Sequence, residues 1–248
     1  MKQKEDKPIL LIMPDIHGRL FWLHAVKKYP NLPIIFLGDY LDPYTHRDCI
    51  FPDEALVNFK EILDFKKANM DRVTLLMGNH DIHYFNREMS CSRKDRENYE
   101  TIHQLFSENL PLFKLAMSVK TNGKNFFFTH AGIVLGWLRF RMPEVHPDDA
   151  DDICSSLNER TATEESFHDF VINGLMDASA SRWGYASYPS PVWADVSDHQ
   201  LIQDRIPNVY QIFGHTQQRS EPVITEQYAC LDCRKAFLLT SAGNIVEA

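Results

Sequence analysis

Short, mainly apolar runs recur along the chain, and each ends in the same way. Residues 9–13, 34–37, 73–77, 126–128 and 209–213 are each followed by one spacer residue and then by Asp, Asn or His. Near-continuous apolar runs of this length are typical of strands buried on both faces of a sheet. Open α/β sheets bind ligands at the carboxyl ends of their strands. We therefore expect the polar residues after these five strands to meet in one crevice.

Sequence patterns typical of helices lie between the first three apolar runs. The stretch 20–28 is apolar-periodic, and Pro52 and Asp53 open a run whose apolar residues recur every three or four positions. This spacing predicts an amphipathic helix with an Asp cap. The resulting strand–helix–strand–helix–strand order predicts a parallel sheet with right-handed crossovers.

The second half of the chain shows a different pattern. Asn122-Gly123 lies between residues 112–119 and 125–129, which predicts a hairpin. Short β-like pieces at 222–224, 228–231 and 237–240 predict a second, more antiparallel sheet packed on the first. The intervening stretch 131–208 contains two expected helices, near 134–141 and 164–178, and an aromatic, proline-rich segment at 182–193. That segment is either a cap over the crevice or a packed loop.

Bulk composition narrows the class of protein. The chain has 248 residues, 44% of them hydrophobic and 24% charged, which is typical of a globular protein and which we interpret as one domain. Its net charge is -8 and no basic patch is present, so we expect no nucleic-acid partner. The first apolar run is too short for a membrane span or a signal-peptide core, so we expect no membrane partner. Five scattered cysteines fit reduced thiols, and we predict a cytoplasmic location.

The residues after the strands are types that bind metals. In chain order they are Asp15, His17, Asp39, Asn79, His130 and His215. Oxygen and nitrogen donors of this kind suit manganese, iron and zinc alike. Two divalent ions that clamp a phosphate need one shared carboxylate, and Asp39 is placed between the other ligands in chain order. We predict two divalent ions (Mn, Fe or Zn) bridged by Asp39.

Two further residues are suited to proton transfer. His80 directly follows Asn79, and imidazole titrates near neutrality, so we expect His80 to protonate a leaving oxygen. Asp42, three residues after Asp39, could accept the other ring N–H and stabilise the imidazolium. Asp81 and Asp195 are expected to brace the site as acceptors for metal-binding histidines.

These motifs, in this order, resemble the signature of the calcineurin-like metallophosphoesterases, and within them the phosphoprotein phosphatase branch with its bacterial and phage members. The motifs are Asp15-Ile16-His17-Gly18, Gly38-Asp39-Tyr40-Leu41-Asp42, Gly78-Asn79-His80-Asp81, Thr129-His130-Ala131-Gly132 and Gly214-His215-Thr216. The resemblance implies an α/β fold, a two-sheet αββα sandwich of mixed sheets flanked by helices. We expect one domain, 1–248, with a cap-like segment at about 133–208.

The resemblance also implies how the ligands divide between two ions. The first ion would be held by Asp15, His17 and Asp39. The second would be held by Asp39, Asn79, His130 and His215. His80 and Asp42 would form the catalytic, proton-donating pair.

One departure from the family pattern affects substrate binding. The branch usually follows the second Asp motif with Arg and Gly, and the arginine grips the substrate phosphate; this chain has Pro43 and Tyr44 instead. We predict that Arg19 or Arg182 replaces it, because the planar guanidinium pairs with two phosphate oxygens. Gln217 stands where phosphodiesterase branches commonly carry a further His, which favours the phosphatase branch.

We accordingly predict a metal-dependent phosphoesterase that hydrolyses phosphomonoesters, including phosphoproteins, by attack of a dimetal-bound hydroxide. One alternative is a hydrolase of dinucleoside polyphosphates or other nucleotides using the same centre, with the aromatic segment stacking a base. A second alternative is a catalytically silent metal-binding interaction module. The expected partner is a phosphorylated small molecule or protein; the sequence does not indicate an oligomeric state.

Overall fold

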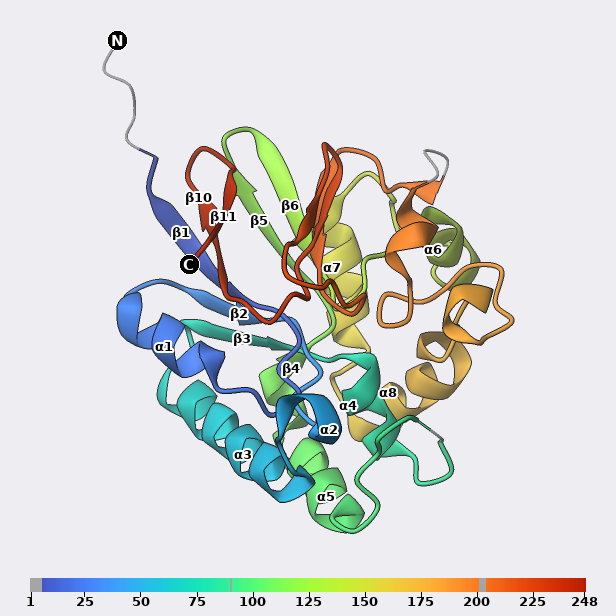
Figure 1. The fold of residues 1–248 in the computed structure, drawn as a ribbon. Coiled ribbons are helices and arrows are strands. Elements are labelled where there is room, and N and C mark those ends of the chain that lie inside the picture. Colours follow the sequence, from blue (N-terminus) through green and yellow to red (C-terminus); the bar gives the residue numbers. More distant parts are fainter. Residues whose placement is uncertain (1–5, 90, 201–203) are drawn as a thin grey trace.

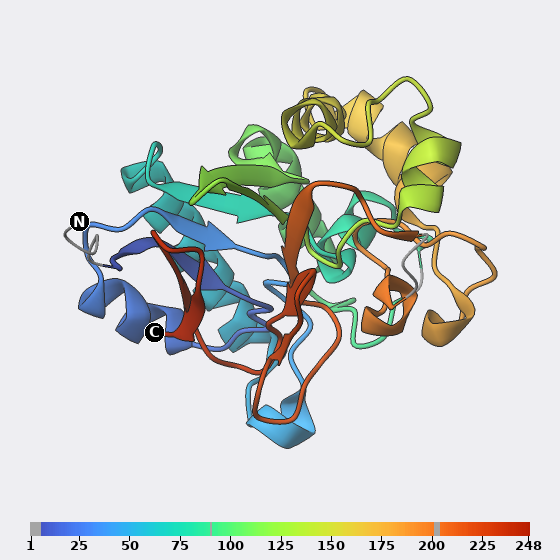
Figure 2. The same cartoon turned by 90° about the horizontal axis from the view of Figure 1, so that it is seen from above.

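Two sheets lie against each other in the computed structural model, which describes residues 6–89, 91–200 and 204–248 (Figures 1 and 2). The first sheet has the strand order β11-β10-β1-β2-β3-β4. Its strands are β1 (Pro8–Met13), β2 (Ile34–Phe36), β3 (Val73–Leu76), β4 (Phe113–Lys114), β10 (Phe237–Thr240) and β11 (Ile245–Glu247). Strands β1 to β4 pair in parallel, and β10 and β11 pair antiparallel at the β1 side.

The second sheet has the order β5-β6-β7-β9-β8. Its strands are β5 (Met117–Thr121), β6 (Lys124–Phe128), β7 (Val209–Phe213), β8 (Val223–Ile224) and β9 (Tyr228–Cys230). Strands β5 and β6 form the hairpin predicted at Asn122-Gly123, and both turn residues have positive φ. Strand β6 pairs in parallel with β7, and β7 pairs in parallel with β9, so both sheets are mixed.

Helices flank the two sheets (Figure 1). Among the described residues they are α1 (Phe21–Lys28), α2 (Thr45–Asp48), α3 (Pro52–Ala68), α4 (Asn79–Ile82), α5 (Tyr99–Asn109), α6 (Leu135–Arg141), α7 (Ala150–Glu159) and α8 (Glu164–Phe170), which continues into a π-helical turn, Val171–Leu175. Helices α1 and α3 cover the outer face of the first sheet, α7 contacts β5, and α6 and α8 lie on the side of the molecule away from α1 (Figures 1 and 2). This arrangement is the predicted α/β sandwich.

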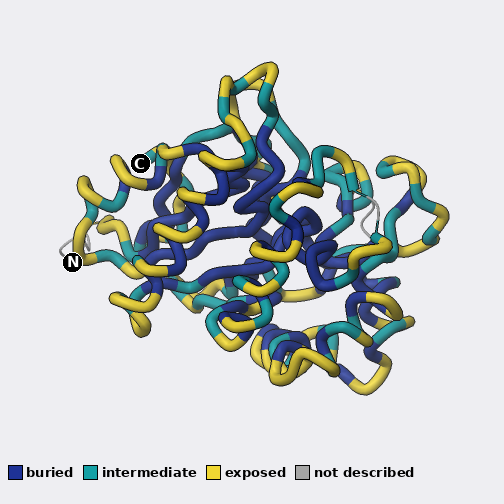
Figure 3. Tube along the Cα trace, turned by 90° about the horizontal axis from the view of Figure 1, so that it is seen from below, coloured by how far each residue is buried: buried dark blue, intermediate teal, exposed yellow. Residues whose placement is uncertain are grey.

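The apolar runs are continuous because both faces of the central strands are covered. In β1, Leu11 packs in the cluster shared with α1 and α3, whereas Leu10 packs in the cluster shared with β6 and β7. In β2, Phe36 packs in the first of these clusters and Ile35 packs in the second. Alternate side chains of a strand point to opposite faces, so each strand serves two cores. Figure 3 shows these strands as the buried centre of the molecule.

The last strands differ from the prediction. The segment 237–240 was expected in the second sheet, but β10 pairs antiparallel with β1 in the first sheet, with Leu238 opposite Leu11. All four residues of β10 are buried. In this position β10 is paired on both sides, with β1 and with β11, and its side chains pack into the cores on both faces of the sheet.

Two helix predictions also need correction. The N-cap of α3 is Phe51, with Pro52 at the first turn and the Glu54 carboxylate accepting the Phe51 backbone N–H; Asp53 is not the cap. Helix α7 was missed, although Asp149 caps it through the backbone N–H groups of residues 151 and 152. Its buried residues are Ala150, Ile153, Cys154 and Leu157. That spacing is the apolar face of a helix.

Within the described residues, no helix is long and apolar enough to cross a membrane. The expectation of one domain with a cap-like segment at 133–208 stays a prediction.

Candidate metal centre

The loops after the strands bring the predicted ligands together. β1 leads to Asp15 and His17, β2 to Asp39, β3 to Asn79 and β7 to His215, all at the same edge of the two sheets. Three of these residues adopt the left-handed backbone region, with φ of 45° at His17, 54° at Asp39 and 61° at His215. Such conformations cost free energy in residues other than Gly and cluster at functional sites.

Asp39 is shared by two groups of donors. One group is Asp15, His17 and Asp39, the other is Asp39, His130 and His215, and in each group the donor atoms lie within 4.8 Å of one another. Oδ2 of Asp39 is 3.4 Å from His17 Nε2, whereas Oδ1 is 3.5 Å from His130 Nε2. Its two oxygens therefore face different histidines, which is the geometry that a bridging carboxylate requires.

Asn79 completes the second group. Its side-chain oxygen lies 3.0 Å from His130 Nε2 and 2.9 Å from His215 Nδ1, and the two ring nitrogens are 3.2 Å apart. Nε2 of His215 is buried and has no hydrogen-bond partner. Nε2 of His130, Nδ1 of His215 and the amide oxygen of Asn79 thus converge, and they form a donor set that fits a divalent ion.

Backbone carbonyls orient the histidines. Nδ1 of His17 lies 2.8 Å from the Leu41 carbonyl oxygen, and Nδ1 of His130 lies 2.8 Å from that of Leu37. Each Nδ1 can donate to its carbonyl, which leaves Nε2 free to bind an ion. The sequence analysis expected Asp81 to accept a hydrogen bond from a metal-binding histidine, and this prediction is wrong. The Asp81 carboxylate accepts the backbone N–H groups of residues 39, 40 and 78, and so fixes the loop that carries Asp39.

The spacer glycines make room for the carboxylates. A Cβ at Gly78 would lie 2.2 Å from Asp39 Oδ1, and a Cβ at Gly214 would lie 2.0 Å from Asp15 Oδ1. Neither distance is compatible with van der Waals radii. The strand–Gly–ligand pattern of the sequence therefore reflects close approach of the backbone to these two oxygens.

The buried carboxylates of Asp15 and Asp39 have too little positive charge nearby to offset the effect of burial on their pKa values. Burial raises the pKa of Asp15 to about 6 and that of Asp39 to about 8, in a chain without bound cations. Burial also lowers the pKa of His17 and His215, so both rings are neutral. Neutral imidazoles and carboxylates that lack counter-ions are the state of a protein site that binds dications.

His80 and Asp42 form the predicted pair. Nδ1 of His80 lies 2.7 Å from Asp42 Oδ2, and both side chains are buried. Burial would raise the pKa of Asp42, but its contacts with His80 and His83 hold the pKa below the ordinary value. Burial lowers the pKa of His80 to about 4. The ionised carboxylate thus accepts the Nδ1–H of a neutral imidazole, and Nε2 of His80 is unprotonated.

The model of the calcineurin-like phosphoesterase family matches residues 10–219, most of the chain. The chain belongs to this family. Solved structures agree at the level of the fold. A cold-active protein-tyrosine phosphatase of a psychrophilic Shewanella species matches with a TM-score of 0.60 at 14% identity, covering 97% of this chain and 80% of that one. A protein serine/threonine phosphatase from Saccharomyces cerevisiae, described as similar to human phosphatase PP5, matches with a TM-score of 0.56 at 14% identity, covering 96% and 78%.

A search of curated proteins gives no match. Family membership assigns the chain to the metal-dependent phosphoesterases and implies a dimetal centre, for which the two donor groups around Asp39 are suited.

Arg93 is the charged residue that the sequence analysis missed. Its Nη2 lies 3.1 Å from His80 Nε2, and its Nε donates to the backbone oxygen of Asp42 at 3.0 Å. The guanidinium carbon lies 3.7 Å from the centroid of the Tyr44 ring. Arg93 therefore packs on Tyr44, which is one of the two residues that replace the Arg-Gly pair of the phosphoprotein phosphatase branch. Its charge acts on the centre, since it lowers the pKa of Asp39 against the effect of burial.

The two arginines selected from the sequence have other partners. Arg19 is buried; its Nε donates to Asp48 Oδ2 at 2.8 Å and its Nη2 lies 2.7 Å from the same oxygen. Arg182 is partly exposed, and its Nη2 contacts Asp195 Oδ2 at 2.9 Å and Thr216 Oγ1 at 2.7 Å. Asp195 therefore pairs with an arginine rather than with a histidine. These contacts leave Arg93 as the arginine nearest to the predicted proton donor.

Asp232 is a second residue that the sequence analysis missed. It is 2% exposed, its Oδ1 has no hydrogen-bond partner, and burial together with the charge of Asp15 raises its pKa. It follows β9 in the second sheet, two residues after Cys230. A polar residue after a strand was the signal used for the other five strands, and here it was obscured by the short strand and by the flanking cysteines.

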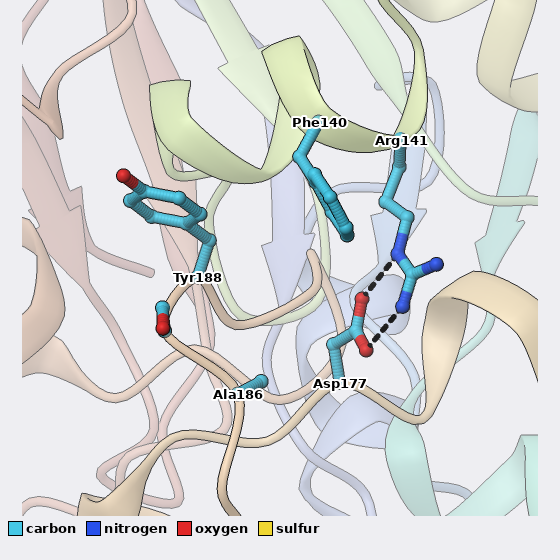
Figure 4. A pocket seen from close by; sticks show the side chains of 6 residues that line it. Phe140, Arg141, Asp177, Ala186 and Tyr188 are labelled. Carbon is cyan, nitrogen blue, oxygen red and sulfur yellow. Dashed lines mark hydrogen bonds and ion pairs between the residues drawn. The ribbon is translucent and has the colours of Figure 1, made fainter.

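Two cavities differ in their relation to the centre. One, of about 390 Å³, is lined by Pro43, Tyr44, Thr45, His46, Arg47, Pro52 and Arg93, and so adjoins the proton-donating pair. Another, of about 300 Å³, lies at α6 and the aromatic segment (Figure 4). There the Arg141 guanidinium is already neutralised by two 2.7 Å hydrogen bonds to Asp177. The first cavity is therefore connected to the His80–Asp42 pair through Arg93, which lines it and contacts His80.

Proposed function

We propose that this chain is a phosphomonoesterase of the phosphoprotein-phosphatase type. The observation that carries the proposal is the carboxylate of Asp39, whose two oxygens face histidines of two separate donor groups. A phosphate bound across such a centre would lie next to the His80–Asp42 pair. His80 is adjacent to Asn79, and Asp42 lies in the loop that carries Asp39. The lack of a further His at Gln217 supports the phosphatase branch.

Each candidate ligand has a place in the proposed centre. Asp15 and His17 would hold one ion, Asn79, His130 and His215 the other, and Asp39 both. When bound, two divalent ions supply a nucleophile from water at neutral pH and positive charge for the phosphate oxygens.

Arg93 and His80 would act together on the substrate. An arginine has no acceptor, so the 3.1 Å contact means that Arg93 donates to an unprotonated Nε2 of His80. A phosphate dianion attracts the guanidinium more strongly than a neutral imidazole does, because planar N–H pairs bind two phosphate oxygens. Arg93 would then leave Nε2, which can carry the proton that the leaving oxygen needs. Asp42 stabilises the resulting imidazolium through Nδ1.

The cavity beside Tyr44 would accept the leaving group. It adjoins Arg93 and is bounded by the ring of Tyr44 and by Arg47, whose guanidinium carbon is 4.2 Å from that ring's centroid. A flat or polar leaving group fits such a wall. The same cavity is open to a phosphorylated side chain of a protein, since Arg47 and His46 are exposed.

The exposed aromatic residues favour one rival activity. Trp183 and Tyr185 are 97% and 102% exposed, and they follow Arg182, which contacts Thr216 next to His215. Exposed rings next to a phosphate site can stack on a nucleobase. Hydrolysis of a nucleotide anhydride by the same centre is therefore the second candidate.

A four-substrate panel tests the proposal. The manganese-loaded protein is assayed with p-nitrophenyl phosphate, a phosphopeptide, bis-p-nitrophenyl phosphate and diadenosine tetraphosphate. The proposal predicts turnover of the two monoesters well above the diester. Preferential turnover of the dinucleotide, reduced in Trp183→Ala but not in Phe140→Ala, would replace it with the rival activity. Phe140 is a suitable control because it is also exposed and aromatic but lines the other cavity.

A further inference from the structure

Four potential metal ligands surround Asp42, outside the two groups that share Asp39. We call Asp42, His80, His83 and Cys91 the Asp42 cluster. Their donor atoms all lie within 4.8 Å of one another. Oδ2 of Asp42 is 2.7 Å from His80 Nδ1 and 3.0 Å from His83 Nε2, and Sγ of Cys91 is 3.6 Å from His80 Nδ1. One oxygen, two nitrogens and one sulfur therefore converge.

His83 provides an independent reason to expect a ligand here. It is 1% exposed, and neither of its ring nitrogens makes a hydrogen bond. Nε2 is close enough to Asp42 for an ion pair but lacks the alignment of a hydrogen bond. Leaving a buried polar group unpaired costs about 1 to 3 kcal/mol. His80 and His83 lie three residues apart on one helical turn, so both rings reach the same carboxylate.

The spacing of the cluster fits a small tetrahedral ion. With metal–nitrogen and metal–oxygen bonds of about 2.0 Å and a metal–sulfur bond of about 2.3 Å, tetrahedral donors are about 3.3 to 3.6 Å apart. Three of the six donor separations are 2.7, 3.0 and 3.6 Å and all six are within 4.8 Å, so each pair needs a shift shorter than one metal–ligand bond. The sulfur donor also distinguishes the cluster from the Asp39 groups, which offer only oxygen and nitrogen. A thiolate favours zinc over manganese.

We propose that the Asp42 cluster is a third metal site that binds Zn²⁺ and thereby inhibits the protein. On binding, Cys91 loses its thiol proton to solvent and a sulfur–zinc bond forms. The zinc also takes Nδ1 of His80, so the proton on that nitrogen moves to Nε2.

Zinc in the cluster disables the proton-donating pair, because the ion occupies Nδ1 of His80 and the Asp42 carboxylate, so the imidazolium that Asp42 would stabilise can no longer form. Asp42 no longer accepts from His80, and Nε2–H now meets the N–H of Arg93, which donates to that nitrogen in the metal-free cluster. Two donors cannot share a hydrogen bond, so Arg93 is displaced. The inhibition rests on the proposed function of His80, whereas the binding of the ion does not.

Cobalt reports sulfur ligation directly, because thiolate-to-cobalt charge transfer absorbs in the near ultraviolet. The manganese-loaded protein is titrated with Co²⁺ for absorbance, and with Zn²⁺ for phosphatase activity. We expect a thiolate band that saturates at one cobalt per chain, and inhibition by zinc. In Cys91→Ser the band disappears, and the zinc concentration for half-inhibition, relative to that variant's own zinc-free rate, rises on the order of tenfold or more.

Cys49→Ser is the matched control, since Cys49 is a free, exposed cysteine outside the cluster. We expect it to keep the band and the sensitivity to zinc. His83→Gln tests the cluster without touching the thiol and should also raise the half-inhibitory zinc concentration.

An unchanged band in Cys91→Ser, or equal zinc sensitivity in Cys91→Ser and Cys49→Ser, would overturn the proposal. A protein without phosphatase activity still gives the cobalt result, so failure of the third site and failure of the proposed function are separable.

Discussion

Nη2 of Arg93 lies 3.1 Å from Nε2 of His80, on the side of the imidazole opposite to Asp42. A cation is thus held at the nitrogen from which a leaving oxygen would take its proton. The guanidinium carbon of Arg93 lies 3.7 Å from the centroid of the Tyr44 ring, a cation–π contact of about 0.5 to 2 kcal/mol. In the proposed mechanism this contact joins the arginine that would bind the phosphate to the histidine that would donate the proton, and it accounts for the absence of the branch's usual arginine after Asp42.

Replacing Arg93 by Ala should raise KM for a phosphomonoester and lower kcat, together reducing kcat/KM about 10- to 1000-fold, because the phosphate loses its charged hydrogen-bond partner in the substrate complex and the transition state. Steady-state kinetics with p-nitrophenyl phosphate measures this loss. Bound metal should be unchanged, since Arg93 is not among the candidate ligands.

Arg87→Ala is the matched control for that experiment. Arg87 lies in the same loop and is exposed; it pairs with the exposed Glu100 and lies 5.5 Å from the centroid of the Tyr99 ring, away from the candidate ligands. Its removal should leave the kinetics unchanged. Equal kinetics for the two alanine variants would assign the phosphate contact to another residue.

Replacing His80 by Ala should lower kcat by about 10² to 10⁴-fold with phenyl phosphate as substrate, because the phenoxide needs a proton as it leaves. The loss should be smaller with p-nitrophenyl phosphate, whose leaving group is a weaker base. Asp42→Asn should show the same dependence on the leaving group in milder form. A loss that is equal for both substrates would mean that His80 positions groups rather than donates the proton.

The predicted ligands could be found from sequence because their signal is local. A strand, one spacer and a metal-ligand side chain are adjacent in the chain. The sheet aligns the carboxyl ends of its strands, and this alignment brings the ligands together. Arg93 has no such signal. It sits between η1 (His83–Phe85) and α5, in a stretch without periodicity, and reaches His80 only through the path of that loop. The pairing of β10 with β1 is equally non-local, since residues 237 and 12 meet across almost the whole chain.

Gly214→Ala should lower the metal content of the purified protein, because its Cβ would lie 2.0 Å from Asp15 Oδ1 and must displace that carboxylate. Elemental analysis of the loaded and desalted protein measures this change. Gly123→Ala is the control: Gly123 has a φ of +75° but no atom within 4 Å of the added Cβ. It should lower the melting temperature and keep the full metal content. Full occupancy in Gly214→Ala would show that Asp15 is not needed at its observed position.

Metal binding should stabilise the protein more as the pH rises. Burial raises the pKa of Asp15 from 3.8 to about 6 and that of Asp39 from 3.8 to about 8 in the metal-free chain. Proton binding to these groups stabilises the fold fully below pH 3.8, and that stability is lost as the pH rises through about 6 and about 8. Bound dications replace the lost protons, so the difference in melting temperature between loaded and metal-free protein should widen.

Thermal unfolding at about pH 6 and about pH 8, with and without Mn²⁺, measures this difference. In Asp39→Asn the difference should be smaller at both pH values and should depend less on pH. A gap that narrows with rising pH in the wild-type protein would contradict the assignment of these carboxylates as ligands.

In the proposed mechanism, Asp39 bridges two ions that together hydrolyse a phosphomonoester. The most direct measurement is the number of bound Mn²⁺ ions per chain, determined on the same samples as the rate of p-nitrophenyl phosphate hydrolysis, for wild type and Asp39→Asn. We expect two ions and turnover in the wild type, and in Asp39→Asn fewer than two ions with turnover lost. Two ions without turnover above that of His80→Ala would instead identify a metal-binding module without catalysis, and full turnover in Asp39→Asn would contradict the bridge.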